Sequence, residues 1–254
     1  MGIEASRRNP WRVAATLRAL RTTVLTTAAV ALAFCLLDAG PDLSLSTPQS
    51  AGVYAMANFS FFAAISGVLI ASSDFGGQLT TSVLAVPNRG SILAAKLVLA
   101  AVVTTVQGVV FAALIATIYQ SYLGDQSVYA TGTAGTLLLN LALAVCSWTA
   151  LGIISTCVAF ITRSQTVALV VMIGLAFGGT PLMMMVPALQ YLPSNAGVLM
   201  FIDRENQTAD WLNPPDITVS AAGITVVLWC AASITAAALV LTRTDIGARQ
   251  ASLE

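Results

Sequence analysis

The stretch SSDFGGQLTTSVLAVPNRGSILAAK, residues 72–96, carries the densest polar chemistry of a chain in which only 9% of residues are charged. Asp74 is placed to form an ion pair with Arg89, with Lys96 or with an arginine near the N-terminus. The glycine pair and Pro87 add turn-forming residues to this charge.

The interior of this stretch, GGQLTTSVLAV, predicts a short helix with Leu79, Val83 and Val86 on one face. Pro87 ends the helix because it cannot continue the backbone hydrogen-bonding pattern. An apolar face on a short helix between two membrane spans needs a partner surface. The alternative is a simple connecting loop, which would need neither this length nor an apolar face.

No Asp, Glu, Lys or Arg lies in the middle of any apolar run, and the chain contains no His. Ion-coupled carriers keep ionisable groups in the middle of the membrane, and voltage sensors carry spaced arginines there. Intramembrane metalloproteases and serine proteases with a His base need a residue type that the chain lacks. Energy for any uphill transport is therefore expected to come from another polypeptide.

The composition places the protein in a membrane. The 254 residues are 57% hydrophobic with a mean hydropathy of +0.85, and the formal net charge of zero offers nothing to a nucleic acid. We expect an all-α membrane protein with one transmembrane domain, residues 1–254, and six spans, each of about 20 apolar residues or more. The predicted spans are 22–39, 51–71, 93–119, 133–161, 166–187 and 217–242. The four cysteines lie in these apolar runs and are expected to be small buried side chains.

The cations predict the orientation of these spans. Ten of the eleven Lys and Arg residues precede span one, follow span six, or lie between spans two and three or four and five, with Arg204 the exception. By the positive-inside rule both termini are cytoplasmic. Residues 7–21 predict an amphipathic interfacial helix that begins at Pro10 and lies along the cytoplasmic surface before span one.

Two sets of span residues are candidates for a path through the membrane. Asn58, Phe61 and Phe62 could line the way of a hydrophobic or amphipathic substrate, and the alternative is that polar span residues only bond neighbouring helices. Met183, Met184 and Met185 in span five offer a soft surface that either fills gaps in the core or accepts varied ligands. Gly178, Gly179, Pro181 and Pro187 are expected to loosen the outer half of that span. Residues 188–216 predict a structured extracellular segment with a short re-entrant or surface helix.

The loop motif resembles the signature of the type-2 permeases of ATP-binding-cassette (ABC) transporters. The matching residues are Asp74, Gly77, Thr80, Thr81, Leu84, Pro87, Arg89, Ala95 and Lys96. Asp74 stands where that family more often has Glu. The resemblance covers the whole chain, because family members also have a basic surface helix, six spans, internal termini and an outer segment between spans five and six.

The resemblance implies an export permease of a bacterial plasma membrane that works as a dimer, with an identical or a sister permease chain. Two separate ATPase subunits would hold ATP and Mg²⁺, because this chain lacks a G-x-x-x-x-G-K-[ST] motif and needs no cofactor of its own. The coupling loop, residues 72–91, would dock on the ATPase through Leu79, Thr80, Thr81, Val83 and Leu84. Pro87 and Arg89 would fix its return into span three, and spans two and five would line the dimer cavity. The exported molecule would be a drug, an antimicrobial peptide, a lipid or a glycan. The alternatives are an ATP-independent carrier or channel, or a membrane scaffold.

Overall fold

The structure of the chain is a computed structural model that describes residues 21–22, 24–26, 28–30, 32–33, 53–73, 89–132, 134–201 and 217–251. The interfacial helix predicted for residues 7–21 lies outside the described residues except for Arg21. The described part of predicted span one is helical.

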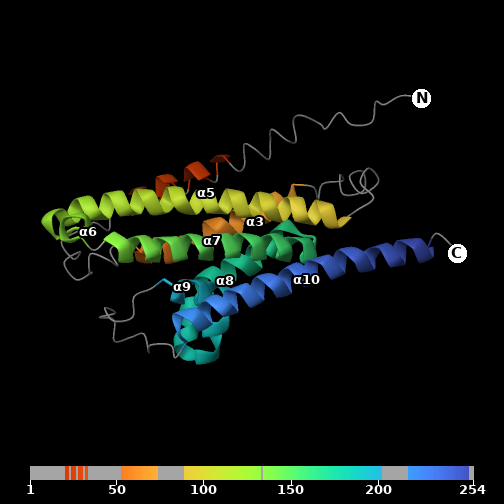
Figure 1. Cartoon of the computed structure of the whole chain (residues 1–254). Coiled ribbons are helices and arrows are strands. Elements are labelled where there is room, and N and C mark those ends of the chain that lie inside the picture. The colour runs from red at the N-terminus through yellow and green to blue at the C-terminus, as the bar shows by residue number, and fades with distance from the viewer. Residues whose placement is uncertain are drawn as a thin grey trace, which may run out of the picture.

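Helices make up the regular structure of these residues, and the described ranges contain no strand. In chain order the elements are α2 (Val53–Asn58), α3 (Phe61–Ser72), α5 (Arg89–Leu123), η2 (Gly124–Gln126), α6 (Val128–Thr131), α7 (Ala134–Thr162), α8 (Gln165–Met185), η3 (Pro187–Tyr191), α9 (Pro193–Leu199) and α10 (Val219–Ala251) (Figure 1).

Four helical segments within the described residues are long and apolar enough to cross a membrane: Ala55–Ser72, Gly90–Gln126, Ala134–Thr162 and Val219–Thr242. They coincide with predicted spans two, three, four and six, so the prediction of a helical, membrane-embedded protein is confirmed at that level. Predicted span five is α8, whose apolar stretch Gln165–Phe177 is shorter. The 35 residues of α5 measure about 52 Å at 1.5 Å per residue, so this helix is longer than the hydrocarbon core of a bilayer is thick.

The long helices place the turns of the chain at two opposite ends (Figure 1). At the end that we call the Lys96 end, α3 ends, α5 begins, α7 turns into α8, and α10 ends. At the opposite end, the Asp125 end, α5 is followed by η2, α6 and the start of α7. The structure therefore groups Lys96 with the turn at Arg163, two of the cations that the sequence assigns to one side.

Local residue chemistry accounts for these turns. Arg163, directly after α7, has a positive φ of 52°, and the Ser164 hydroxyl accepts a hydrogen bond from the Val167 amide and caps α8. Gly132 ends α6 with a φ of 72°, a conformation that costs a glycine little. Pro187 and Pro193 each stand in the first turn of η3 and α9. The α8 backbone stays helical through Pro181 and ends at Met185. Pro187 then begins the short helix η3.

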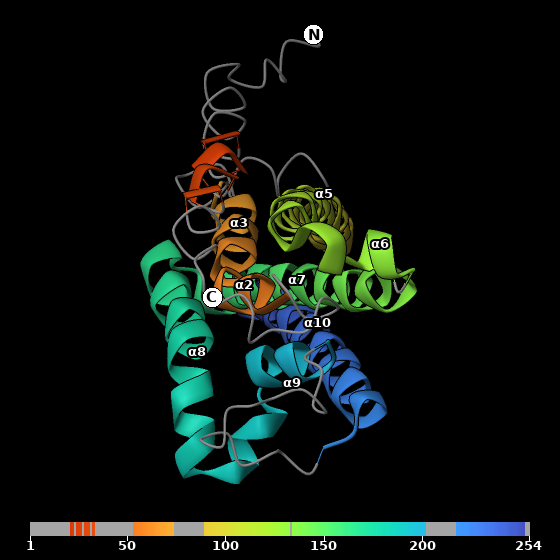
Figure 2. The same cartoon turned by 90° about the vertical axis from the view of Figure 1, so that its left-hand side faces the viewer.

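Helix α7 lies at the centre of the bundle. Figure 2 shows α3 and α5 on one side of it and α9 and α10 on the other. The backbones of α3 and α7 come very close, because a Cβ atom built on Gly67 would overlap the Gly152 carbonyl oxygen and the Ser155 hydroxyl. A Cβ atom on Gly152 would in turn overlap the Thr104 side chain of α5. Small residues at such crossings are what membrane helices use to approach each other.

Hydroxyl and amide side chains add hydrogen bonds to this crossing. The Thr156 hydroxyl of α7 shares its proton between the Gly67 carbonyl of α3 at 3.1 Å and the Gly152 carbonyl of its own helix at 2.8 Å. Ser66 donates to Gln107 of α5 at 2.9 Å, and both side chains are buried. Thr105 of α5 and Thr149 of α7 share a hydrogen bond of 2.8 Å. These polar span residues therefore bond neighbouring helices, which was the alternative to lining a substrate path.

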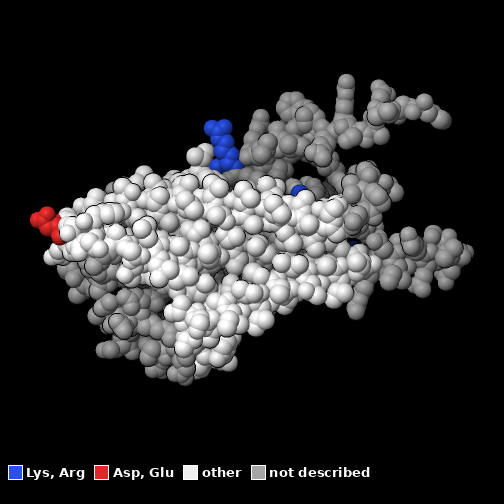
Figure 3. Space-filling view, viewed as in Figure 1, with Lys and Arg blue, Asp and Glu red and all other residues white. Residues whose placement is uncertain are grey.

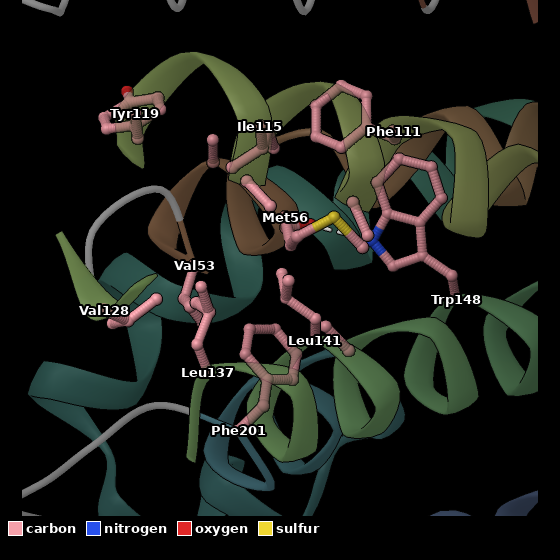
Figure 4. Close-up of a cluster of buried hydrophobic side chains, with 14 of the residues drawn as sticks. Val53, Met56, Phe111, Ile115, Tyr119, Val128, Leu137, Leu141, Trp148 and Phe201 are labelled. Atoms are coloured by element: carbon pink, nitrogen blue, oxygen red, sulfur yellow. Dashed lines mark hydrogen bonds between the residues drawn. The ribbon is translucent and has the colours of Figure 1, made fainter. Parts of the chain in front are cut away.

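The apolar core has two main parts. The first gathers Val53, Met56, Phe111, Trp148 and Phe201 with their neighbours towards the Asp125 end (Figure 4). The second joins α3, α5, α7 and α8 through Val68, Leu93, Ile154, Phe160 and Met172. Both parts connect helices that are far apart in sequence, so they fix the arrangement of the spans.

The segment after α8 returns into the bundle. In α9, residues Ser194 to Gly197 are buried, and a Cβ atom on Gly197 would overlap the Ser147 hydroxyl of α7. Ser194 donates to the Leu175 carbonyl of α8 at 3.0 Å. The described part of the predicted 188–216 segment thus holds a short helix that packs against α7 and α8 and ends at Leu199, whereas residues 202–216 lie outside the described ranges.

The outer surface of the described residues carries few charges in the view of Figure 3: an acidic group at one end and a basic side chain that protrudes at the top. Many large apolar side chains are exposed on it, among them Val98, Val106, Leu138, Val170, Ile224 and Val227. An aqueous surface rarely exposes so much apolar area, whereas lipid chains are the natural neighbours of these side chains. The three described cysteines are free thiols, with Cys157 buried, Cys230 half-buried and Cys146 exposed.

We predict that Gly67→Ala destabilises the folded protein by about 2 kcal/mol or more, because the added methyl group meets a backbone carbonyl that cannot rotate away. Gly174→Ala is the matched control, since a Cβ atom on Gly174 of α8 meets nothing within 4 Å. Unfolding by denaturing detergent measures both variants. Equal stability of the two would contradict a close crossing of α3 and α7.

Candidate functional site

Predicted span two is interrupted part of the way along. Helix α2 ends at Asn58 and α3 begins at Phe61, with a turn between them. The Ser60 amide donates to the Ala57 carbonyl, three residues back, at 3.3 Å. An α-helix would pair that amide with the Met56 carbonyl, four residues back. The interruption therefore takes the Met56 carbonyl out of the helical pattern.

An indole from another span bonds to that carbonyl. Trp148 Nε1 of α7 donates to the Met56 carbonyl oxygen at 2.8 Å, as Figure 4 shows. Both residues are 0% exposed. The Trp148 ring packs on Phe111 of α5 with ring centroids 5.0 Å apart, so the indole is held from two directions.

An aromatic cluster surrounds the interruption and joins spans two and five. Phe61 lies 4.3 Å from Phe62 and 4.8 Å from Phe177 of α8, measured between ring centroids. Phe59 lies 5.7 Å from Phe111. Offset and tilted ring pairs at these separations are favourable, so the aromatic side chains tie α3 to both α8 and α5.

The predicted path residues differ in their exposure. Asn58 is exposed, Phe61 is half-buried and Phe62 is buried. Phe177, which the sequence analysis did not single out, is 57% exposed and continues the aromatic face of Phe61 onto span five. An exposed amide three residues before an aromatic side chain offers both polar and apolar groups to a molecule that has both.

The three methionines of span five do not form one surface. Met183 is buried against Leu199, Ile217 and Ala222, which places it in the core beside α9 and α10. Met185 is 80% exposed, and the side chain of Met184 lies outside the described residues. Met183 thus fills the core, whereas Met185 is open to a ligand.

At the Lys96 end a single cation joins two spans. Lys96 Nζ of α5 donates to the Ile70 carbonyl of α3 at 3.0 Å and to the Ser73 hydroxyl at 2.5 Å. Ser73 donates in turn to the Ile70 carbonyl at 2.9 Å. The last carbonyls of a helix carry partial negative charge, so a cation stabilises them. Lys96 therefore fastens the two helices between which the loop leaves and re-enters the bundle.

Most of the residues predicted to couple the chain to an ATPase fall in the gap between α3 and α5. Asp74, Leu79, Thr80, Thr81, Val83, Leu84 and Pro87 lie outside the described residues, and of Arg89 only the helical backbone at the start of α5 is described. On the α3 side the gap begins directly after Ser73, whose hydroxyl accepts a hydrogen bond from Lys96.

Two residues of the site, Trp148 and Phe177, were not predicted from the sequence. A signal existed for Trp148, because an indole N–H within a span must find an acceptor. Among the described residues, no three His, Cys, Asp or Glu side chains gather to hold a metal ion.

Comparison with known proteins adds no identity to this geometry. No family model matches the sequence, and no curated protein matches it.

We predict that Lys96→Met lowers the free energy of unfolding by about 1–3 kcal/mol, because it leaves partly buried acceptors of α3 without their charged donor. Lys96→Arg keeps a donor and is expected to lose less. Detergent unfolding compares these variants with Arg163→Gln, a change at an exposed cation of the same end. If Lys96→Met unfolds like Arg163→Gln, the Lys96 bonds do not hold α3 to α5.

Proposed function

We propose that the chain is the transmembrane permease subunit of an ATP-driven ABC exporter in a bacterial plasma membrane, with six spans and the type-2 exporter fold. It moves a hydrophobic or amphipathic molecule out of the cytoplasm, and a separate ATPase subunit supplies the energy. The permease works with a second permease chain, identical or a sister. The Lys96 end is the cytoplasmic end, in accord with the positive-inside rule.

The observation that carries the proposal is the fastening of α3 to α5 by Lys96. These helices flank the loop that bears the permease motif, so a force on the loop acts on both together. Helix α3 also crosses α7 at Gly67 without room for a methyl group. Closely packed helices transmit displacement because their interface cannot be compressed. Docking of an ATPase at the loop would therefore move the centre of the bundle.

The cargo class follows from the exposed groups at the α2–α3 interruption. Asn58 supplies an amide, and Phe61 and Phe177 supply adjoining aromatic faces. Such a surface suits an amphipathic molecule such as a drug, a peptide, a lipid or a lipid-linked glycan. The described spans contain no charge in their central parts, which fits a cargo that needs no compensating ion.

We predict that the double variant Leu79→Asp, Leu84→Asp loses the ATPase from the complex while still inserting into the membrane, because charges on an apolar docking face oppose its burial. Affinity purification from native membranes followed by assay of Mg²⁺-dependent ATP hydrolysis measures this loss. The control is Tyr129→Asp, which places a charge at an exposed position of the Asp125 end.

The proposal is wrong if wild-type preparations contain no ATPase. It is also wrong if the double variant retains as much ATP hydrolysis as the control. Transport that continues without the ATPase would indicate a carrier or channel instead.

We predict that Phe61→Ala raises the KM for efflux of Nile red, an uncharged amphipathic aromatic probe, by about two- to tenfold, since an aromatic pair contributes roughly 0.5–1.5 kcal/mol beyond area burial. Asn58→Ala is expected to act in the same direction. Val98→Ala on the exposed face of α5 is the control and should leave KM unchanged. Efflux from loaded vesicles gives the rates, and equal KM values in all three variants would remove the aromatic face from the cargo path.

A further inference from the structure

The interruption of span two leaves a main-chain acceptor in an apolar interior. With the Ser60 amide turned to Ala57, the Met56 carbonyl loses its helical donor, in a position that is 0% exposed. A carbonyl buried without a donor is unfavourable, so the interruption is stable only if another group supplies one. Trp148 Nε1 supplies it at 2.8 Å from a residue 92 positions away.

This hydrogen bond helps to determine the direction of α2 relative to α3. Only six residues make up α2, and a helix that short has little stability of its own. Its direction relative to α3 therefore depends on tertiary contacts at Val53 and Met56, which lie in the core with Trp148. The Trp148 ring is itself fixed against Phe111. The fixed indole therefore holds α2, the first part of span two, in one direction.

The last residue of α2 is Asn58, two positions after the bonded carbonyl and exposed. Phe59 follows it and contacts Phe61, Phe62 and Phe111 through its ring. A change in the direction of α2 would therefore displace the exposed amide relative to the aromatic face of Phe61 and Phe177.

We propose that Trp148 is a positioning residue: by bonding the Met56 carbonyl, it fixes the direction of α2 and thereby the position of Asn58 relative to the aromatic face of Phe61 and Phe177, which receives the cargo. Its link to cargo rests on the proposed function, whereas its control of α2 does not. Trp148 itself is buried and touches no cargo. It acts through the main chain of α2.

The experiment compares two tryptophans that bond main-chain carbonyls. Trp148→Phe removes the N–H but keeps an aromatic ring against Phe111. Trp229→Phe is the matched control, because Trp229 Nε1 of α10 donates to the Tyr191 carbonyl at 2.7 Å, away from α2. Hydrogen–deuterium exchange of the purified, detergent-solubilised chain is followed in peptides covering residues 53–60 and in peptides from α5 and α7.

For Trp148→Phe we expect exchange in residues 53–60 to become about tenfold faster or more, with α5 and α7 changed by no more than about twofold. For Trp229→Phe we expect no change in residues 53–60. Unchanged exchange in 53–60 overturns the proposal, and so does an acceleration spread equally over α5 and α7, since that would mean a general loss of stability.

A second variant covers the case in which Trp148→Phe does not fold. Replacement of Trp148 by 3-benzothienylalanine, which has sulfur in place of the indole N–H, keeps the shape of the side chain and removes only the donor. It should reproduce the local acceleration in 53–60, and wild-type exchange there would overturn the proposal.

A position-specific readout follows residue 58 itself. The modification rate of the Asn58→Cys variant by a maleimide is compared with that of the Ser91→Cys variant, at the Lys96 end, each made with Trp148 intact and with Trp148→Phe. Mass spectrometry identifies the modified peptides. We expect Trp148→Phe to change the rate at position 58 by about threefold or more and to leave the rate at position 91 constant.

Equal ratios of the two rates with and without the indole would show that position 58 does not depend on Trp148, which would overturn the proposal. Neither exchange nor maleimide modification involves transport or an ATPase, so failure of the exporter proposal would be seen separately.

Discussion

The close crossing of α3 over α7 is the constraint on which the rest of the structure depends. Gly67 and Gly152 let two backbones approach until a methyl group would not fit, and Thr156 then reaches the Gly67 carbonyl. In lipid, apolar side chains gain little by leaving one apolar surrounding for another, so close packing and hydrogen bonds must hold helices together. With α3 and α7 fixed, Thr104 brings in α5, and Phe61 and Met172 bring in α8.

The C-terminal ends of α2 and α3 then acquire different roles from the same physical requirement. Each of these ends leaves carbonyl groups that need a donor, because apolar surroundings supply none. At the Lys96 end the donors are the Lys96 ammonium group and the Ser73 hydroxyl. At the interruption, the donor for the Met56 carbonyl is the Trp148 indole. The first bonds join the helices beside the motif-bearing loop, and the second orients the short helix that carries Asn58. Span two thus connects the proposed site of ATPase docking to the proposed cargo face.

Much of the architecture was predictable because it depends on composition and local chemistry. Apolar runs of sufficient length predicted four helices now seen at membrane length, and a short helix was expected after span five. The candidate site was predictable only in part. Asn58 is exposed and Phe61 is half-buried, but Phe62 is buried and Met183 is covered by α9 and α10. Sequence separation hides such a partner, since Leu199 and Ala222 reach Met183 only through the return of α9 into the bundle.

What the sequence by itself determined is the solvent of this protein, the helical character of its spans and the grouping of its cations, because these follow from side-chain hydropathy and charge one residue at a time. The resemblance of the 72–96 stretch to a permease motif is likewise a property of the sequence alone. Only the tertiary structure decided that span two is interrupted at Phe59 and Ser60, that Trp148 bonds the carbonyl exposed there, and that Phe177 extends the aromatic face. These features depend on which groups meet across helices, and such meetings are set by the packing of the whole bundle.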